Sequence, residues 1–194
     1  MKKTLFALIL SSLAFSATAA PYVQADLGYS NIEIDTGEGY NWDDSSFAQR
    51  ISVGYGFERF RVAADYTNFG KMKLSERAGN TYADLSVKFK SIGLSAFYDF
   101  KSDGAIAFGP ANEFIPYVGL RLSSNDGKVS ASGYSPYYGS EKISLSESST
   151  GIGGMIGGQY FMTENFGVNV GVEYNRLFSD VNQYGAKVGV RYSF

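Results

Sequence analysis

The sequence predicts an all-β fold, an eight-stranded antiparallel transmembrane β-barrel of the bacterial outer membrane. Three observations support this prediction. Apolar residues recur at every second position in eight separate runs, glycine is abundant between them, and aromatic residues gather near both ends of the runs. Alternation with a period of two is typical of β-strands that have one apolar face.

The first 19 residues have the features of a cleaved secretory signal. Lys2 and Lys3 precede an apolar stretch at 4–15, and small residues at 17–19 form a cleavage site. The stretch is too short to serve as a membrane anchor, so we expect cleavage after Ala19 and a mature chain of residues 20–194. Without the two lysines this chain has 15 basic and 19 acidic residues, hence a net charge of −4. Nothing in this balance favours nucleic-acid binding.

Eight alternating runs follow in the mature chain. In the seventh, FGVNVGVEY, every second residue from Phe166 is apolar. The fourth run changes phase between Phe89 and Ile92, which predicts a β-bulge near Lys90 and Ser91. The runs span 22–30, 46–57, 60–69, 84–100, 115–123, 150–162, 166–176 and 184–194.

The polar face of these strands is predicted to line the barrel interior. Glycine and serine crowd this face, although glycine weakens a strand that only faces solvent. The narrow interior of an eight-stranded barrel, in contrast, requires small side chains. The apolar face then contacts lipid, and aromatic residues at each end, such as Phe60 and Tyr98 or Tyr29 and Tyr66, fit two interfacial belts.

The connections between the predicted strands differ at the two ends of the barrel. Tight turns at 58–59 and 162–165 lie at the end that carries the C-terminus, together with a longer segment at 101–114. Four external loops are expected at the other end, at about 31–45, 70–83, 124–149 and 177–183. Short periplasmic turns and longer external loops are typical of outer-membrane barrels.

Nine charged residues fall on the predicted interior face. The functional possibility is a charge-lined conducting pore, and the structural one is a plug of mutually paired ions. We favour the plug, because an eight-stranded barrel is just wide enough for side chains to fill and buried charges are tolerated when paired. The nine residues are Asp26, Arg50, Arg61, Asp65, Asp99, Arg121, Glu173, Lys187 and Arg191.

Candidate ligand-binding residues lie in the expected external loops. The segment SGYSPYYGSEK (132–142) combines Tyr with Ser and Gly, a composition typical of adaptable binding loops. Its tyrosines could form an external aromatic patch with residues of the first loop, or could pack the loops against one another. The aromatic candidates are Tyr40, Trp42, Tyr134, Tyr137 and Tyr138.

The second expected loop is basic. Lys71, Lys73 and Arg77 could contact lipopolysaccharide phosphates or sulfated glycans through charge-assisted hydrogen bonds. The alternative is an ordinary solvated basic loop.

Several strand sequences resemble one family of outer-membrane proteins. The segments are SIGLSAFYDF (91–100), PYVGLRL (116–122), YVQADLGYS (22–30), ISVGYGFERFRVAADYTNF (51–69) and VGVRYSF (188–194). They resemble the opacity-type porin family, which includes the neisserial opacity (Opa) adhesins and neisserial surface protein A. The resemblance implies an eight-stranded outer-membrane barrel whose variable loops engage host molecules.

The last predicted strand, 184–194, ends on an aromatic residue. We expect it to pair with the first strand, which closes the barrel without a free edge. A closed barrel needs no partner chain, so we expect a monomer. Val190, Tyr192 and Phe194 resemble the C-terminal signal that is read by the outer-membrane assembly machinery.

The chain contains neither histidine nor cysteine, and a serine nucleophile normally needs a histidine base at neutral pH. We therefore expect no catalytic, cofactor or metal site. The expected function is that of an integral surface protein in the outer membrane of a Gram-negative bacterium, with loops that mediate adhesion or host-factor binding. The alternative is a small porin or a structural barrel without a dedicated ligand. Expected partners are outer-membrane lipid and lipopolysaccharide, the assembly machinery, and a host receptor, glycan or serum factor, but no nucleic acid.

Overall fold

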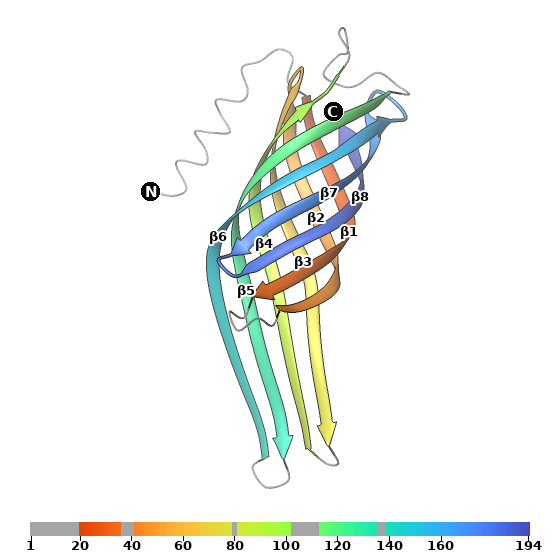
Figure 1. Ribbon diagram of the computed structural model, residues 1–194. Helices are drawn as coiled ribbons and strands as arrows, with labels where there is room; N and C mark the ends of the chain where they lie inside the picture. Colours follow the sequence, from red (N-terminus) through yellow and green to blue (C-terminus); the bar gives the residue numbers. More distant parts are fainter. Residues whose placement is uncertain (1–19, 36–40, 79–80, 102–112, 136–138) are drawn as a thin grey trace.

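The computed structural model describes residues 20–35, 41–78, 81–101, 113–135 and 139–194, and their backbone forms eight antiparallel strands (Figure 1). Each strand pairs with the next and β8 pairs with β1, so the sheet is a closed barrel and the predicted fold is confirmed. The expected signal segment, 1–19, lies outside the described residues. The strands are β1 (Ala20–Asp35), β2 (Asn41–Gly56), β3 (Phe60–Ala78), β4 (Thr81–Asp99), β5 (Phe114–Ser135), β6 (Gly139–Phe161), β7 (Phe166–Phe178) and β8 (Val181–Ser193).

The barrel has an apolar outer face and a polar interior, as predicted. Leu120 is 67% exposed on the outside, whereas its neighbour Arg121 is 1% exposed on the inside. Leu27, Ile51 and Val170 are exposed in the same way on other strands. An outer surface of this kind is stable only where lipid covers it. Within the described residues, no helix is long and apolar enough to cross a membrane.

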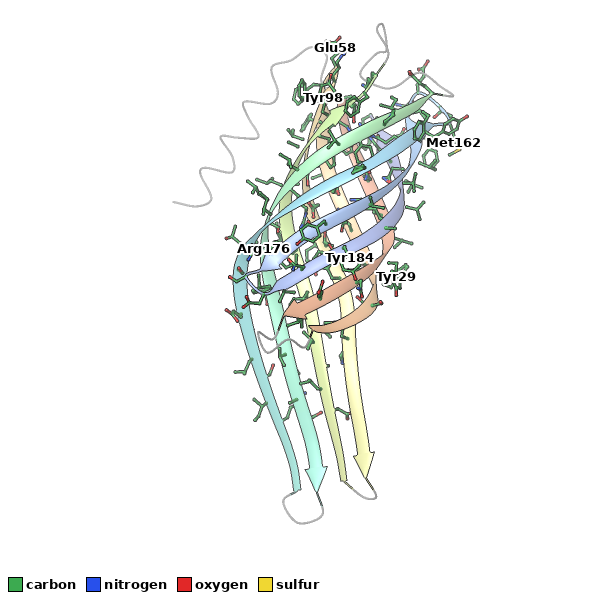
Figure 2. All side chains as sticks on the ribbon, in the orientation of Figure 1. Tyr29, Glu58, Tyr98, Met162, Arg176 and Tyr184 are labelled. Carbon is green, nitrogen blue, oxygen red and sulfur yellow. The ribbon has the colours of Figure 1, made fainter. Side chains whose placement is uncertain are left out.

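Aromatic side chains mark two levels on the outer face (Figure 2). Tyr98 lies near the end of the barrel that holds the tight turns, and Tyr29 and Tyr184 lie toward the other end. Phe60 packs edge-on against Tyr98 with ring centroids 5.2 Å apart. The two levels correspond to the predicted interfacial belts.

The first and last strands form the seam of the barrel. β1 and β8 pair from Tyr22 opposite Ser193 to Ile34 opposite Val181. The backbone N–H of Phe194 also donates a hydrogen bond to the carbonyl of Pro21, at 3.0 Å. The predicted pairing is confirmed, and the barrel is closed at this seam.

The strands continue through most of the segments that were expected to be external loops. The β3–β4 and β5–β6 hairpins project well past the other strands at the end away from the C-terminus (Figure 1). The segments between paired strands at this end shrink to residues 36–40, 79–80, 136–138 and 179–180. The loops were expected wherever the lipid-facing alternation ends. A strand in water can keep its backbone pairing beyond that point without a continuous apolar face, so the expected loops were too long.

The predicted bulge at Lys90 and Ser91 is wrong. The β4–β5 register runs without a shift from Tyr82 to Asp99. The irregularity lies in β3, where Phe69 and Gly70 oppose the single residue Phe89. Gly70 has φ 89°, a conformation that suits glycine. The phase change in β4 has another cause, namely that its apolar side chains pass from the lipid face to the interior.

Candidate functional site

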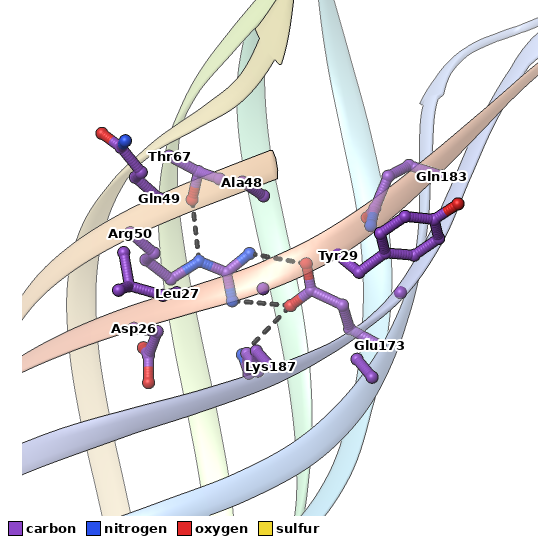
Figure 3. Close-up of a pocket in the computed structure, with 13 residues that line it drawn as sticks. Asp26, Leu27, Tyr29, Ala48, Gln49, Arg50, Thr67, Glu173, Gln183 and Lys187 are labelled. Atoms are coloured by element: carbon purple, nitrogen blue, oxygen red, sulfur yellow. Dashed lines mark hydrogen bonds and ion pairs between the residues drawn. The ribbon is translucent and has the colours of Figure 1, made fainter. Parts of the chain in front are cut away.

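The centre of the barrel contains a cluster of ion pairs around Glu173 (Figure 3). The Arg50 guanidinium donates two hydrogen bonds to this carboxylate, at 2.7 and 3.0 Å, and Lys187 Nζ donates a third at 3.0 Å. Arg50 Nε also donates to Thr67 Oγ1 at 2.7 Å. A bidentate pair with an additional cation fixes the geometry of all three charged groups.

A second pair extends this cluster toward β5. Arg121 donates to the Asp65 carboxylate from Nε at 3.0 Å and from Nη2 at 2.6 Å. Its Nη2 also donates to Ser91 Oγ at 3.0 Å. Because Asp65 Oδ1 lies 3.6 Å from Arg50 Nε, the two pairs form one network across the lumen.

Another cluster lies nearer the tight turns. Arg61 donates to both oxygens of Asp99, at 2.9 and 2.8 Å. Its guanidinium lies 4.4 Å from the ring centroid of Phe97 and 5.0 Å from that of Tyr117. The rings supply cation–π contact in a layer where carboxylates are scarce.

Two of the predicted interior charges are held by neutral partners. Asp26 accepts hydrogen bonds from the amides of Gln24 and Asn169. Arg191 donates to Gln159 Oε1 at 2.7 Å and stacks over a tyrosine ring, that of Tyr22, at 3.8 Å. The structure thus brings all nine predicted charged residues to the interior and joins seven of them in ion pairs.

The side chains nearly fill the lumen at this level. A cavity beside Arg50, Glu173 and Lys187 has a volume of about 20 Å³ (Figure 3), and one beside Asp65 has about 10 Å³. A cavity of this size holds about one water molecule. The geometry is that of a packed plug.

An apolar cluster lies inside the barrel toward the external end. Its buried members pack against Phe178, whose ring centroid is 6.0 Å from that of Phe89. The sequence prediction did not anticipate this layer, because it placed Ile32, Met72 and Leu177 in external loops. The cluster consists of Ile32, Phe69, Met72, Val87, Phe89 and Leu177.

The outer face of the projecting sheet is basic. Lys71 of β3 pairs with Lys88 of β4, which pairs in turn with Lys128 of β5. These lysines and Lys142 of β6 line a hollow of about 480 Å³. Ser86, Ser130 and Ser132 supply hydroxyl groups to the same hollow. We call this surface the lysine face.

Comparison with known proteins places this geometry in a family. Residues 53–194 match the model of the opacity family of porin proteins. The chain belongs to the opacity family. An uncharacterized protein of Haemophilus influenzae is 44% identical to this opacity-family chain over the full length of both. The protein named opa from the same organism is 34% identical, covering 73% of this chain and all of the relative.

A solved structure agrees with the family assignment. The crystal structure of neisserial surface protein A is 30% identical to this opacity-family chain, with a TM-score of 0.62. It matches 91% of this chain and 99% of that one. The protein is therefore an outer-membrane β-barrel of a Gram-negative bacterium, as the sequence predicted.

The predicted external ligand residues are distributed differently from the expectation. Lys71 is exposed on the lysine face. Lys73 and Arg77 lie within strand β3 rather than in a loop. Trp42 and Tyr134 lie within β2 and β5, and the side chains of these four residues are outside the described part of the structure. Tyr40, Tyr137 and Tyr138 also lie outside the described residues.

The predicted assembly signal lies on the lipid face of β8. Val190, Tyr192 and Phe194 are all exposed on the outside of this opacity-family barrel. The rings of Tyr192 and Phe194 pack edge to face, with centroids 5.1 Å apart. Its role as a signal stays a prediction.

Sequence reasoning missed the aromatic residues that face the interior. Tyr22, Phe97 and Tyr117 contact the guanidinium groups of Arg61 and Arg191. Their positions indicate an interior location, since each residue falls in the alternating set of positions that is otherwise polar. It also missed the hydroxyl partners Thr67 and Ser91. Both lie on the interior face, but the residue type alone does not distinguish a hydrogen-bonding Ser or Thr from one that only occupies space.

Proposed function

We propose that this opacity-family protein binds an external protein partner, in adhesion or host-factor capture, through the projecting part of the β5–β6 hairpin. One observation carries the proposal, namely an apolar strip on the inner side of this hairpin. Val129 pairs with Leu145, and Ala131 pairs with Ile143. Three of these side chains have large exposed fractions, 40% for Val129, 69% for Leu145 and 60% for Ile143.

The strip lies in water rather than in lipid. On both strands its residues alternate with those of the outward face, which carries Lys128 and Ser144 at this level. In the same cross-strand row, on β3 and β4, the inner side is covered by the apolar cluster, where Met72 and Val87 are buried. Apolar residues left exposed beyond that cover are typical of an interaction site.

A channel function is less well supported by the geometry. The ion-pair network leaves room for single water molecules, and the apolar cluster lies inside the barrel toward the external end. A purely structural barrel, in contrast, would have no use for the exposed strip, so loss of binding on changing the strip separates a binding protein from a structural one.

Cells that display the intact protein are screened against panels of host receptors, matrix proteins and glycans. The inner-side variant Ile143→Asn/Leu145→Asn is compared with Ser144→Asn/Ser146→Asn, which changes the outward side of the same strand. We expect only the inner-side variant to lose binding, while both keep a heat-modifiable barrel on gels. Equal binding by the two variants contradicts the proposal, and a wild-type protein that binds nothing favours the structural alternative.

A further inference from the structure

We infer that the lysine face binds the phosphate groups of the phosphorylated glycolipids in the outer leaflet, that is, of lipopolysaccharide. This site is separate from the proposed partner site, because the lysine face and the apolar strip lie on opposite sides of the projecting sheet. The inference rests on the height of the lysines, on their mutual repulsion and on the hydroxyl groups beside them.

On β4, two lysines follow directly on the lipid-contacting residues of the same outward face. On β4 the last aliphatic residue of this face is Ile92, and Lys90 and Lys88 come two and four residues beyond it. At about 3.3 Å per residue these steps are about 7 and 13 Å along the strand. The headgroup region extends about 5–8 Å past the hydrocarbon on each side. Long lysine side chains reach back toward such an interface.

The cross-strand pair formed by Lys88 and Lys128 is unfavourable by itself. Cβ atoms of directly opposed residues on neighbouring strands lie about 5 Å apart, and like charges in this position destabilise the sheet. Among the described residues, Lys88 and Lys128 engage in no hydrogen bond or ion pair. An anion bound between them removes the repulsion.

The charge on this outward face is strongly unbalanced. Asp126 lies opposite Lys90 in the row next to the membrane, which leaves Asp84 as the carboxylate that lines the hollow. The described side chains of the face include the basic residues Lys71, Lys88, Lys90, Lys128 and Lys142 and the acidic residues Asp84 and Asp126. A surface with this excess attracts anionic headgroups.

The hollow has the donors and the size that a phosphate-bearing headgroup requires. Ser86, Ser130 and Ser132 are half-buried and can donate hydrogen bonds beside the ammonium groups. Charge-assisted donors of this kind bind phosphate oxygens strongly. A volume of about 480 Å³ lies in the range of ligand sites, which is about 300–1,000 Å³.

The test uses the full mature chain, refolded in a zwitterionic detergent and titrated with diphosphorylated lipid A or with fully dephosphorylated lipid A. We expect tighter binding of the diphosphorylated lipid, weakened by added salt. Lys88→Gln/Lys128→Gln should lower this affinity roughly 10- to 30-fold. Asp84→Asn should raise it, because one repelling carboxylate leaves the hollow.

Two controls test whether the positive charge and its position matter. Lys88→Arg/Lys128→Arg keeps the charge and should bind nearly as the wild type does. Arg59→Gln removes one charge from the β2–β3 turn at the opposite end of the barrel and should have no effect. Equal affinity for the two lipids, or no loss in the double Gln variant, overturns the inference. Lysine-dependent binding of heparin without binding of lipid A also overturns it, in favour of a soluble sulfated glycan.

Discussion

The membrane-embedded barrel and the projecting β3–β6 sheet have opposite polarity. In the barrel, Leu94 faces outward and Arg121 faces inward. In the projecting sheet, Lys88 faces outward, whereas Val87 and Leu145 face inward. The strands are continuous across the change, so the same alternating backbone serves two solvents. The point of inversion, near Phe89 and Ser91 on β4, marks where lipid gives way to water.

The largest effect is expected from the interior of the barrel. Arg121→Leu leaves the Asp65 carboxylate without its bidentate partner and should destabilise the barrel by about 3–5 kcal/mol. Denaturant unfolding in detergent micelles measures this loss. Arg176→Leu, on an exposed residue, is the control and should change the midpoint little. An Arg121→Leu barrel with a wild-type midpoint contradicts a role for the ion-pair network in stability.

A charge on the outward face separates the two regions directly. Leu120→Arg places a cation on the lipid face and should cost about 2–4 kcal/mol. Ser130→Arg makes the same addition on the outward face of the projecting sheet and should cost under about 1 kcal/mol, because in water only the neighbouring lysines oppose it. The two variants are compared by unfolding after folding into lipid vesicles. Similar losses would mean that the outward face does not change solvent between these rows.

The inward apolar residues allow the reverse comparison. Met72 is 3% exposed in the apolar cluster, and Met72→Ala should cost about 2 kcal/mol, at the low end for such truncations. Leu145→Ala, on the exposed strip, should leave stability unchanged while it weakens partner binding. Thermal or denaturant unfolding of both variants provides the check, and an equal loss at the two positions would show that the strip is covered in the folded protein.

The smallest effect concerns the bulge. Gly70→Ala puts a side chain at φ 89° with its Cβ 2.8 Å from Ser46 Cβ, and should cost about 1–2 kcal/mol. Gly154→Ala meets open space and should be neutral or slightly stabilising. Unfolding curves of the two variants distinguish these outcomes. A neutral Gly70→Ala would mean that the bulge does not help to fix the β3–β4 register.

The sequence predicts side-chain orientation best where one face of a strand contacts lipid along its whole length. Residues such as Ile51 and Val170 could be assigned to lipid because each strand repeats the same phase, and the interior charges follow from the same phase. The pairing of Arg50 with Glu173 could not be read in this way, because the residues are 123 positions apart and any of several acids could have been the partner.

The projecting sheet was missed because its cues differ from those of the barrel. Ile143 and Leu145 alternate with serines on β6, but a loop was expected because lipid-facing alternation had ended. Phe69 followed by Gly70 was the local signal of the bulge. The phase change at Phe89 predicts a backbone bulge in β4, whereas in the structure it reflects a change of solvent on the two faces of the strand.

The claim that the barrel is a sealed scaffold is tested most directly by planar-bilayer recording of the purified wild-type protein. The packed ion-pair network and the apolar cluster predict no sustained open channel at moderate voltage. A steady, reproducible conductance through the wild-type barrel would contradict the account and would favour a channel function.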